Sequence, residues 1–380
     1  ILGNHTLLGG VQGYFTRLRE TGLYVISAED EKTSPYYGVP YTSIGKKHAN
    51  ELGFFIQDEW NVTPKLTVVP GIRVDSHSSG EEYATSVKVS DSAFPTTKFS
   101  KTTVNPRIAI KYEVTPSLVL RANIGTGFRA PYGFSEDLHL CSGSPRVWKS
   151  SNLKGERAIS YNLSADYYAK KYQFSINIFR TNLKDKIQFS PADDEVKKFG
   201  YSYQWENVDD AYVQGVELGA KANLFRNFNA GINWTFNQGK FKHERADWSD
   251  PNDETVKEFP QRLQYAKDSR NISRFPAMTG DIDLDYTPGT WSFSLTSSLQ
   301  GRMYIDYNSE DDGATSKIKK TNTFMLFNCR AAKRFGMCTV YAGAKNIFSY
   351  IQDEKHTDDA AFMYAPVYGA TWYVGLSVKL

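Results

Sequence analysis

Long apolar runs are missing from this sequence of 380 residues. A helix that crosses a membrane needs about 20 consecutive apolar residues. No stretch of the chain approaches that length, and the mean hydropathy is −0.49. These observations exclude a helical membrane protein. They leave a membrane β-barrel open, because every second residue of a barrel strand can be polar.

Cysteine and excess charge are scarce as well. The three cysteines, Cys141, Cys329 and Cys338, have neither the spacing of a metal site nor that of a redox motif. Forty-five basic residues nearly balance 42 acidic ones, and no run of Lys and Arg indicates a nucleic-acid-binding arm. We therefore exclude nucleic acid as a partner. We also expect no catalytic site, no resident metal ion and no cofactor.

Aromatic residues, in contrast, are abundant, with 24 Tyr, 23 Phe and 7 Trp. This content suffices for the two aromatic girdles of a membrane barrel, although a soluble all-β protein can also reach it. The pattern of the strands is more informative. Leu118, Leu120 and Ile124 alternate with Arg121 and Asn123. A period of two places these sets on opposite faces, and such regular polar residues predict a hydrated interior with lipid outside.

Fourteen strands of this kind can be counted, with six short turns and seven long polar loops in strict alternation. Outer-membrane barrels have short periplasmic turns and longer extracellular loops. With the C-terminus inside, every long loop then lies outside. We therefore predict an all-β fold, a transmembrane antiparallel β-barrel. The expected strands are His5–Arg19, Leu52–Trp60, Leu66–Asp75, Val104–Val114, Leu118–Phe128, Ile159–Tyr168, Tyr172–Phe189, Tyr201–Leu224, Phe228–Phe236, Thr279–Tyr286, Trp291–Leu299, Thr323–Arg334, Cys338–Ile347 and Thr371–Leu380.

The same alternation assigns side chains to the two faces of the wall. Apolar members should meet lipid, whereas charged and amide members should line the lumen. The expected lipid-facing residues are Leu66, Ile72, Ile108, Ile110, Leu118, Ile159, Leu163, Leu218, Ile232, Trp372, Val374 and Leu376. The expected lumen-facing residues are Arg107, Lys111, Arg121, Asn123, Asp166, Glu217, Lys221, Asn233 and Asp283.

Four short motifs follow one another along the chain. Gly127-Phe128-Arg129-Ala130-Pro131 ends a strand, and Asn152-Leu153-Lys154-Gly155-Glu156 returns from the next loop into a tyrosine-rich strand. Gly215-Val216-Glu217-Leu218 and Lys345-Asn346-Ile347-Phe348 follow. In these motifs the sequence resembles the C-terminal part of the barrel of TonB-dependent outer-membrane receptors. The resemblance covers essentially all 380 residues.

The resemblance implies that residues 1–380 are the C-terminal portion of a 22-stranded barrel that is normally plugged. The plug domain and the N-terminal strands of the family are not recognisable in this sequence. The chain opens Ile-Leu-Gly-Asn-His, with no initiator Met and no signal peptide. We therefore expect a piece of a longer protein, and a complete 14-stranded barrel is the alternative.

The resemblance also implies a function, which is active import through the outer membrane of a Gram-negative bacterium. The ligand would be a scarce nutrient chelate, with haem, an iron siderophore and cobalamin all open. TonB would supply energy through a segment outside this sequence. Outer-membrane lipids are further expected partners, and a surface lipoprotein is another candidate. Two alternatives are a passive porin-like channel and a non-transporting adhesin barrel, and an upstream plug domain would distinguish the receptor from both.

Ligand contacts are expected in the outer loops. Imidazole is an axial ligand of haem iron, and all histidines except His5 fall in or beside the long loops. Similarity to haem receptors singles out His139, which lies between the FRAP and Asn-Leu motifs. Arg129 and Arg146 would meet the propionates as charge-assisted partners. The alternative is a solvated loop histidine.

Aromatic residues at strand ends and loop tips are a second kind of candidate. They can stack on a planar ligand, or they can belong to the outer aromatic girdle. The complete set of candidate binding residues is His139, Arg129, Arg146, Tyr201, Tyr203, Trp205, Tyr304, His356 and Tyr364.

Two of the cysteines flank the turn at Arg334-Phe335-Gly336. Cys329 and Cys338 would form a disulfide if the strand register placed them opposite each other, since an outer-membrane location permits oxidation. The alternative is a pair of small, outward-facing free thiols.

Overall fold

A computed structural model describes most of the chain. The described residues are 3–25, 37–86, 94–132, 147–191, 193–198, 201, 203–243, 270–272, 274–309, 314–352 and 365–379. Strands dominate these residues, and the helix α1 (Asp194–Lys197) is a single turn capped by Asp193. Within the described ranges no helix has the length and apolarity that a membrane crossing requires.

The main sheet is antiparallel along the order β1-β2-β3-β4-β5-β7-β8-β9-β10-β11-β12-β15-β16-β17. The short strand β6 joins it by parallel pairing with β9, and β13 and β14 form a separate hairpin. The strands are β1 His5–Tyr24, β2 Tyr41–Thr63, β3 Leu66–Thr85, β4 Thr97–Thr115, β5 Leu118–Arg129, β6 Val147–Lys149, β7 Glu156–Tyr168, β8 Tyr172–Pro191, β9 Tyr203–Phe225, β10 Phe228–Phe241, β11 Met278–Tyr286, β12 Trp291–Gln300, β13 Tyr304–Ser309, β14 Ala314–Lys320, β15 Phe324–Phe335, β16 Cys338–Lys345 and β17 Thr371–Val378.

Each of the 14 predicted strands corresponds to one of the 14 strands on this path. The prediction missed β6, β13 and β14. β6 has three residues, too few for a period to be visible. The predicted acidic loop Asn308–Lys319 is wrong, because β14 occupies Ala314–Lys320. Its sequence ATSKIKK has hardly any apolar residues to alternate with polar ones, so the signal for a strand was lost.

β2 and β3 also extend beyond their predicted ends, to Tyr41 and Thr85 respectively. This extension corrects the assignment of two histidines to loops, since His48 lies within β2 and His77 within β3. Both extensions are rich in Ser, Lys and Glu, so they have no alternating apolar residues from which a strand could be predicted. Their polar side chains are instead satisfied by tertiary contacts described below.

Two short turns share a Thr-Pro sequence and the same local hydrogen bonds. The Thr63 hydroxyl accepts from the backbone N–H groups of Lys65 and Leu66 at 3.2 and 3.0 Å. Thr115 does the same for Ser117 and Leu118 at 3.2 and 3.1 Å. At each turn a threonine hydroxyl thus accepts hydrogen bonds from backbone N–H groups at the point where the chain reverses.

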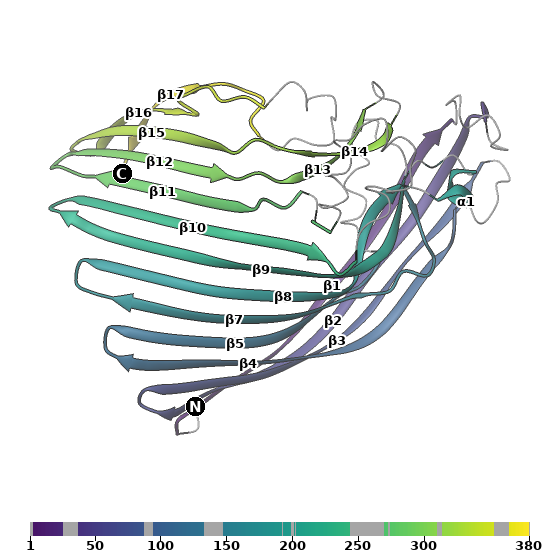
Figure 1. Ribbon diagram of the computed structural model, residues 1–380, viewed down its shortest axis with the longest axis horizontal. Helices are drawn as coiled ribbons and strands as arrows, with labels where there is room; N and C mark the ends of the chain where they lie inside the picture. Colours follow the sequence, from purple (N-terminus) through teal and green to yellow (C-terminus); the bar gives the residue numbers. More distant parts are fainter. Residues whose placement is uncertain are drawn as a thin grey trace. The chain divides into compact units, whose positions relative to one another are not determined.

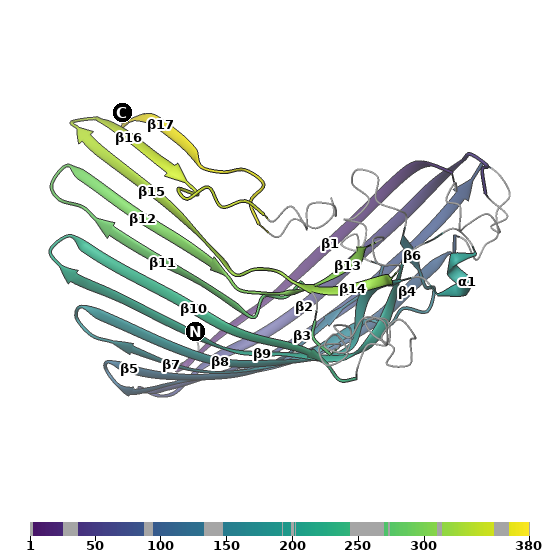
Figure 2. The same cartoon turned by 45° about the horizontal axis from the view of Figure 1, so that its top comes forward.

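Two compact units make up the chain. Unit 1 contains Ile1–Ile110, Asn123–Tyr161 and Thr181–Ala211, and in it β1, β2 and β3 lie side by side (Figure 2). Unit 2 contains Lys111–Ala122, Asn162–Arg180 and Tyr212–Leu380. In unit 2 the strands β10, β11, β12, β15 and β16 follow one another, and the short turns lie at one end (Figure 1).

The apolar face of the wall is exposed. Of the twelve side chains predicted to face lipid, ten are exposed and only Leu66 and Leu118, each the first residue of a strand, are half-buried. The opposite face carries polar pairs. Arg121 contacts Asp166, and the Asn233 amide donates to Asp281 at 2.8 Å. An exposed apolar face opposite a polar face is the expected arrangement for a barrel wall in lipid.

The hypothesis of a disulfide is wrong. Both Cys329 and Cys338 are free. Cys329 is opposite Ala344 in the register, whereas Cys338 is opposite Phe335 at the turn. Six residues of strand therefore separate the two thiols along the hairpin, a distance of about 20 Å, and a disulfide tolerates no more than about 7 Å between Cα atoms.

Candidate functional site: the base of the loop after β5

The FRAP motif leads the chain from the end of β5 onto the polar face of β3. The Ser79 hydroxyl on β3 donates to the carbonyl of Pro131 at 2.7 Å. Tyr132 follows with a φ of 61°, in the left-handed region that is rare outside glycine. The side chain of Tyr132 is almost completely buried, at 1% exposure. Tertiary packing thus holds a strained turn at the start of the loop.

Tyr132 joins the two motifs that the loop separates. Its hydroxyl donates to the carbonyl of Ser150 at 2.7 Å and accepts from the N–H of Leu153 at 3.1 Å. Burial of the phenol raises the pKa of Tyr132 to about 12. The hydroxyl therefore remains a proton donor throughout the physiological range. Tyr132, the residue after the FRAP motif, thus bonds the backbone of the segment that carries the Asn-Leu motif.

Apolar packing completes this junction. Leu153, Ile187 and Trp205 form a buried cluster with Tyr132, and Phe99 packs against it. β6 pairs with the start of β9, with Lys149 opposite Trp205. The returning segment is therefore fixed to β9 by its backbone and to Tyr132 by its side chains. We call Pro131–Tyr132 together with Val147–Gly155 the loop base.

A buried ion pair fixes the loop base to β3. The Lys149 ammonium donates to Glu81 at 2.6 Å, and their side chains are only 6% and 1% exposed. The second carboxylate oxygen of Glu81 accepts from the Tyr83 hydroxyl at 2.6 Å. The pair is thus satisfied by further hydrogen bonds, as a buried ion pair requires. Glu81 thus has polar partners in a part of β3 that has no apolar stripe.

Gly155 and Glu156, the last two residues of the Asn152–Glu156 motif, contact the end of β5. A Cβ on Gly155 would overlap the ring of Phe128 and lie 3.0 Å from the carbonyl of Arg129, so only glycine fits. Arg129 donates to Glu156 at 3.0 Å. Glu156 in turn accepts from the N–H of Ile187 at 2.7 Å. The motif residues therefore hold the strand ends together.

Further along β3 the polar face carries a charged network. Arg73 contacts Asp75 at 2.6 Å and Glu51 at 3.1 Å. The ring of His77 lies 3.6 Å from Glu51 and 3.2 Å from the Thr103 hydroxyl. His77 is therefore already enclosed by polar partners. Among the described residues, no three His, Cys, Asp or Glu side chains are grouped so as to hold a metal ion.

The predicted binding residues are distributed as follows. Arg129 is ion-paired with Glu156. Tyr201 is buried against Val196 and Trp148, and Trp205 lies in the Tyr132 cluster, so these two aromatic rings serve the packing of the loop base. Tyr203 and Tyr304 begin β9 and β13. His139, Arg146, His356 and Tyr364 lie outside the described residues, and their ligand contacts stay predictions.

Sequence reasoning missed Glu81, Lys149 and Tyr132 as members of this region. Tyr132 directly follows the FRAP motif and could have been noticed as part of it. Glu81 and Lys149 are 68 residues apart, and each stands in a stretch that reads as solvated loop. Only the fold brings them together.

We expect Tyr132→Phe to loosen the loop base without unfolding the wall. The substitution leaves the buried N–H of Leu153 without its acceptor, which costs about 1–3 kcal/mol. Amide hydrogen exchange of residues 147–155 should accelerate, while exchange of β2 and β3 should not. In the wild type, the raised pKa means that this protection persists below about pH 10 and declines as the pH rises toward about 12. Unchanged exchange at Leu153 would contradict the assigned hydrogen bond.

The exposed apolar face, the paired polar face and the short turns at one end define an outer-membrane β-barrel wall. The particular family is identified by comparison with known proteins. A family model described as "TonB dependent receptor-like, beta-barrel" matches residues 2–347, and the chain belongs to this family of Gram-negative outer-membrane receptors.

Individual relatives are distant. The chain is 26% identical over 229 residues to the vitamin B12 transporter BtuB of Photobacterium profundum, which covers 60% of this chain and 30% of that protein. It is 25% identical over 208 residues to the ferric enterobactin receptor of Pseudomonas aeruginosa, covering 50% and 24%. The chain thus spans less than a third of the length of these curated relatives.

Solved structures give the same fold. The ferric yersiniabactin uptake receptor FyuA from Yersinia pestis matches with a TM-score of 0.63 at 15% identity, over 98% of this chain and 50% of that one. The ferric citrate transporter FecA matches with a TM-score of 0.62 at 18% identity, over 93% and 48%. The chain therefore spans about half of each receptor.

Proposed function

We propose that this chain forms part of a receptor that imports a scarce nutrient chelate with energy supplied through TonB. Membership of the TonB-dependent receptor family carries the proposal. The relatives named above are receptors or transporters for vitamin B12, ferric enterobactin, ferric yersiniabactin and ferric citrate. Each of these ligands is a chelated metal, which supports the same ligand class here.

The wall geometry is compatible with such a ligand. The polar face of unit 1 carries Arg73, Glu51 and His77 in one network, so a polar chelate would pass charged groups rather than apolar ones. On this same face, Ser79 bonds the carbonyl of Pro131 and Glu81 pairs with Lys149, and these two contacts lie on either side of residues 133–146 in the sequence. Residues 133–146 include His139 and Arg146, two of the nine candidate binding residues.

A direct binding assay tests the proposal. The complete receptor is purified in detergent and titrated separately with ferric enterobactin, ferric citrate, cobalamin and haem, with tryptophan fluorescence as the readout. We expect saturable binding of one of these ligands, and uptake in cells that is lost when TonB is deleted. Saturable uptake that continues without TonB would instead identify a passive channel. Binding without any uptake would identify an adhesin-like barrel.

Haem gives a specific expectation because of the order FRAP, His139, Asn-Leu. If haem is the ligand, an imidazole ligand should shift its Soret band, and His139→Ala should remove that shift. Failure of the wild type to bind haem would exclude haem while leaving other chelates open. A Soret shift that survives in His139→Ala would move the axial ligand to another residue.

A further inference from the structure

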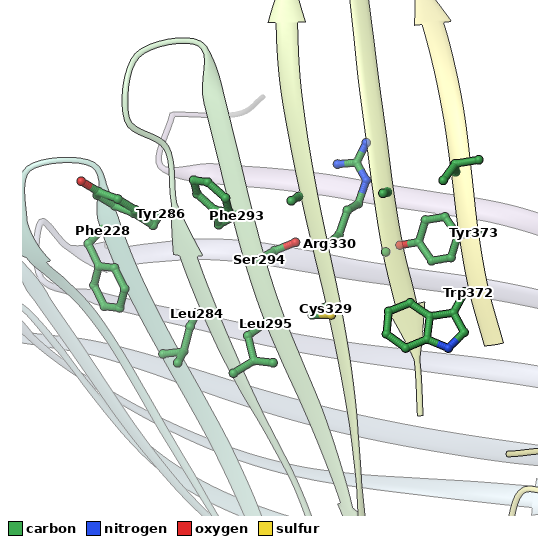
Figure 3. A pocket seen from close by; sticks show the side chains of 14 residues that line it. Phe228, Leu284, Tyr286, Phe293, Ser294, Leu295, Cys329, Arg330, Trp372 and Tyr373 are labelled. Atoms are coloured by element: carbon green, nitrogen blue, oxygen red, sulfur yellow. The ribbon is translucent and has the colours of Figure 1, made fainter. Parts of the chain in front are cut away.

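Unit 2 carries an apolar groove of ≈ 660 Å³ across its hairpins. Its lining combines the small residues Cys329, Ala331 and Ala342 with larger apolar side chains, and it also includes Arg330. Figure 3 shows Leu284, Leu295, Cys329 and Trp372 in a row that crosses from β11 to β17. The strand register places all four on one face, because Leu284 pairs with Leu295, Leu295 with Cys329, Cys329 with Ala344 and Ala344 with Trp372.

This face is the one that meets lipid. Trp372 and Val374 in the groove are 74% and 83% exposed. The volume lies in the range of about 300–1,000 Å³ that is typical of small-molecule pockets. An apolar groove of this size on a membrane-facing wall suits a hydrocarbon chain.

Lys333 lies near the end of the groove that is closest to the β15–β16 turn. Lys333 follows Ala331 by two residues on β15 and therefore lies on the same face. Its ammonium is 4.7 Å from the ring of Trp291 and 5.1 Å from that of Phe335. Trp291 stacks on Phe293, a groove residue, at 5.7 Å. No carboxylate in the described part of the chain is ion-paired with Lys333.

A second groove in the same unit provides a comparison. It has ≈ 600 Å³ and is lined by Phe174, Ile176, Leu218, Trp234 and other residues, none of them charged. The lysine on the turn side of this second groove, Lys171, lies in the β7–β8 turn, whereas Lys333 lies within β15 beside two aromatic rings. Charge complementarity at Lys333 indicates an occupant with an anionic end and an apolar tail.

We propose that the groove across β11, β12, β15, β16 and β17 binds an anionic glycerophospholipid of the periplasmic leaflet. Short turns of outer-membrane barrels are periplasmic, so Lys333 lies at the level of the headgroups of that leaflet. An acyl chain lies against the lining residues Cys329, Ala331 and Ala342. The headgroup phosphate accepts a charge-assisted hydrogen bond from Lys333, and the surrounding rings occupy the interface that aromatic residues prefer.

Native mass spectrometry of the complete receptor tests this site. The receptor is mixed in detergent with equal amounts of phosphatidylglycerol and phosphatidylethanolamine that carry the same acyl chains. We expect bound phosphatidylglycerol to exceed phosphatidylethanolamine by about fivefold, since one lysine near the surface contributes about 1 kcal/mol for anionic lipid. Lys333→Ala should reduce this ratio to about one, and Lys333→Arg should restore it.

Two further variants separate the groove from the charge. Ala331→Trp places a bulky ring in the lining of the groove and should lower the occupancy of both lipids. Lys171→Ala removes an exposed lysine near the β7–β8 turn and should change neither. Heat-modifiable migration on gels establishes that each variant is folded.

Three results would overturn the proposal. They are an unchanged lipid ratio in Lys333→Ala, unchanged occupancy in Ala331→Trp, and a wild-type dimer that Ala331→Trp converts to a monomer. The last result would assign the groove to a second copy of the chain.

Discussion

Replacing Lys149 by methionine is expected to destabilise the loop base by about 3–5 kcal/mol, because it leaves the carboxylate of Glu81 buried and unpaired. Glu81 is 1% exposed and cannot turn to solvent. Hydrogen exchange of residues 147–155 should accelerate at least about a hundredfold, since each 1.4 kcal/mol corresponds to a factor of ten. The strands of unit 2 should keep their protection.

Two control variants isolate the pair. Lys154→Met removes an exposed ion pair in the same segment, 3.9 Å from Asp185 with Lys154 73% exposed, and should cost less than about 1 kcal/mol. Lys149→Met combined with Glu81→Gln removes both charges and should recover most of the lost protection. If Lys149→Met behaved like Lys154→Met, the ion pair would have no special role in holding the loop.

The second large effect concerns the lipid face. Ile232→Arg places a charge on the exposed apolar face of β10 and should lower the free energy of unfolding in lipid vesicles by about 2–4 kcal/mol. The destabilisation comes from transferring a guanidinium into hydrocarbon. Urea titration followed by tryptophan fluorescence measures it.

The adjacent residue is a matched control at the same depth. Asn233 lies on the opposite face and donates to Asp281 at 2.8 Å. Asn233→Arg keeps a donor beside that carboxylate and should change the free energy of unfolding by less than about 1 kcal/mol. Equal effects of the two substitutions would mean that the faces are not lipid and lumen.

These two sets of variants probe different parts of the molecule. The arginine pair tests whether the wall faces lipid, and the Lys149 series tests how the loop base is held on β3. Neither depends on which chelate the receptor carries. A receptor that failed every ligand titration would still be expected to show both effects.

The motifs of the sequence have physical explanations in the fold. Gly155 is required because the ring of Phe128 occupies the space of a Cβ. Asn346 closes the start of the last loop, where its amide donates to the carbonyls of Tyr350 and Tyr368 at 2.7 and 3.1 Å. These are local or nearby demands on residue type. Because each demand acts on a single position, it can be recognised in one sequence.

The sequence by itself determined the 14 strands of the main path and the two faces of the wall. Period-two alternation is a local property of neighbouring residues, and lipid on one side with polar groups on the other enforces it along every strand. The same alternation at Trp372, Val374 and Leu376 placed the last strand and its exposed face.

Only the tertiary structure decided the ends of β2 and β3, the loop base and the state of the cysteines. Outside the membrane a strand needs no apolar stripe, so the sequence pattern predicted a loop at His77 and Glu81. In the structure these two residues of β3 contact side chains from β2, β4 and β6. The register of β15 against β16 separated Cys329 from Cys338, although the turn between them was predicted correctly. Contacts between residues far apart in the chain depend on the register of many strands at once, and a single sequence carries no local signal for them.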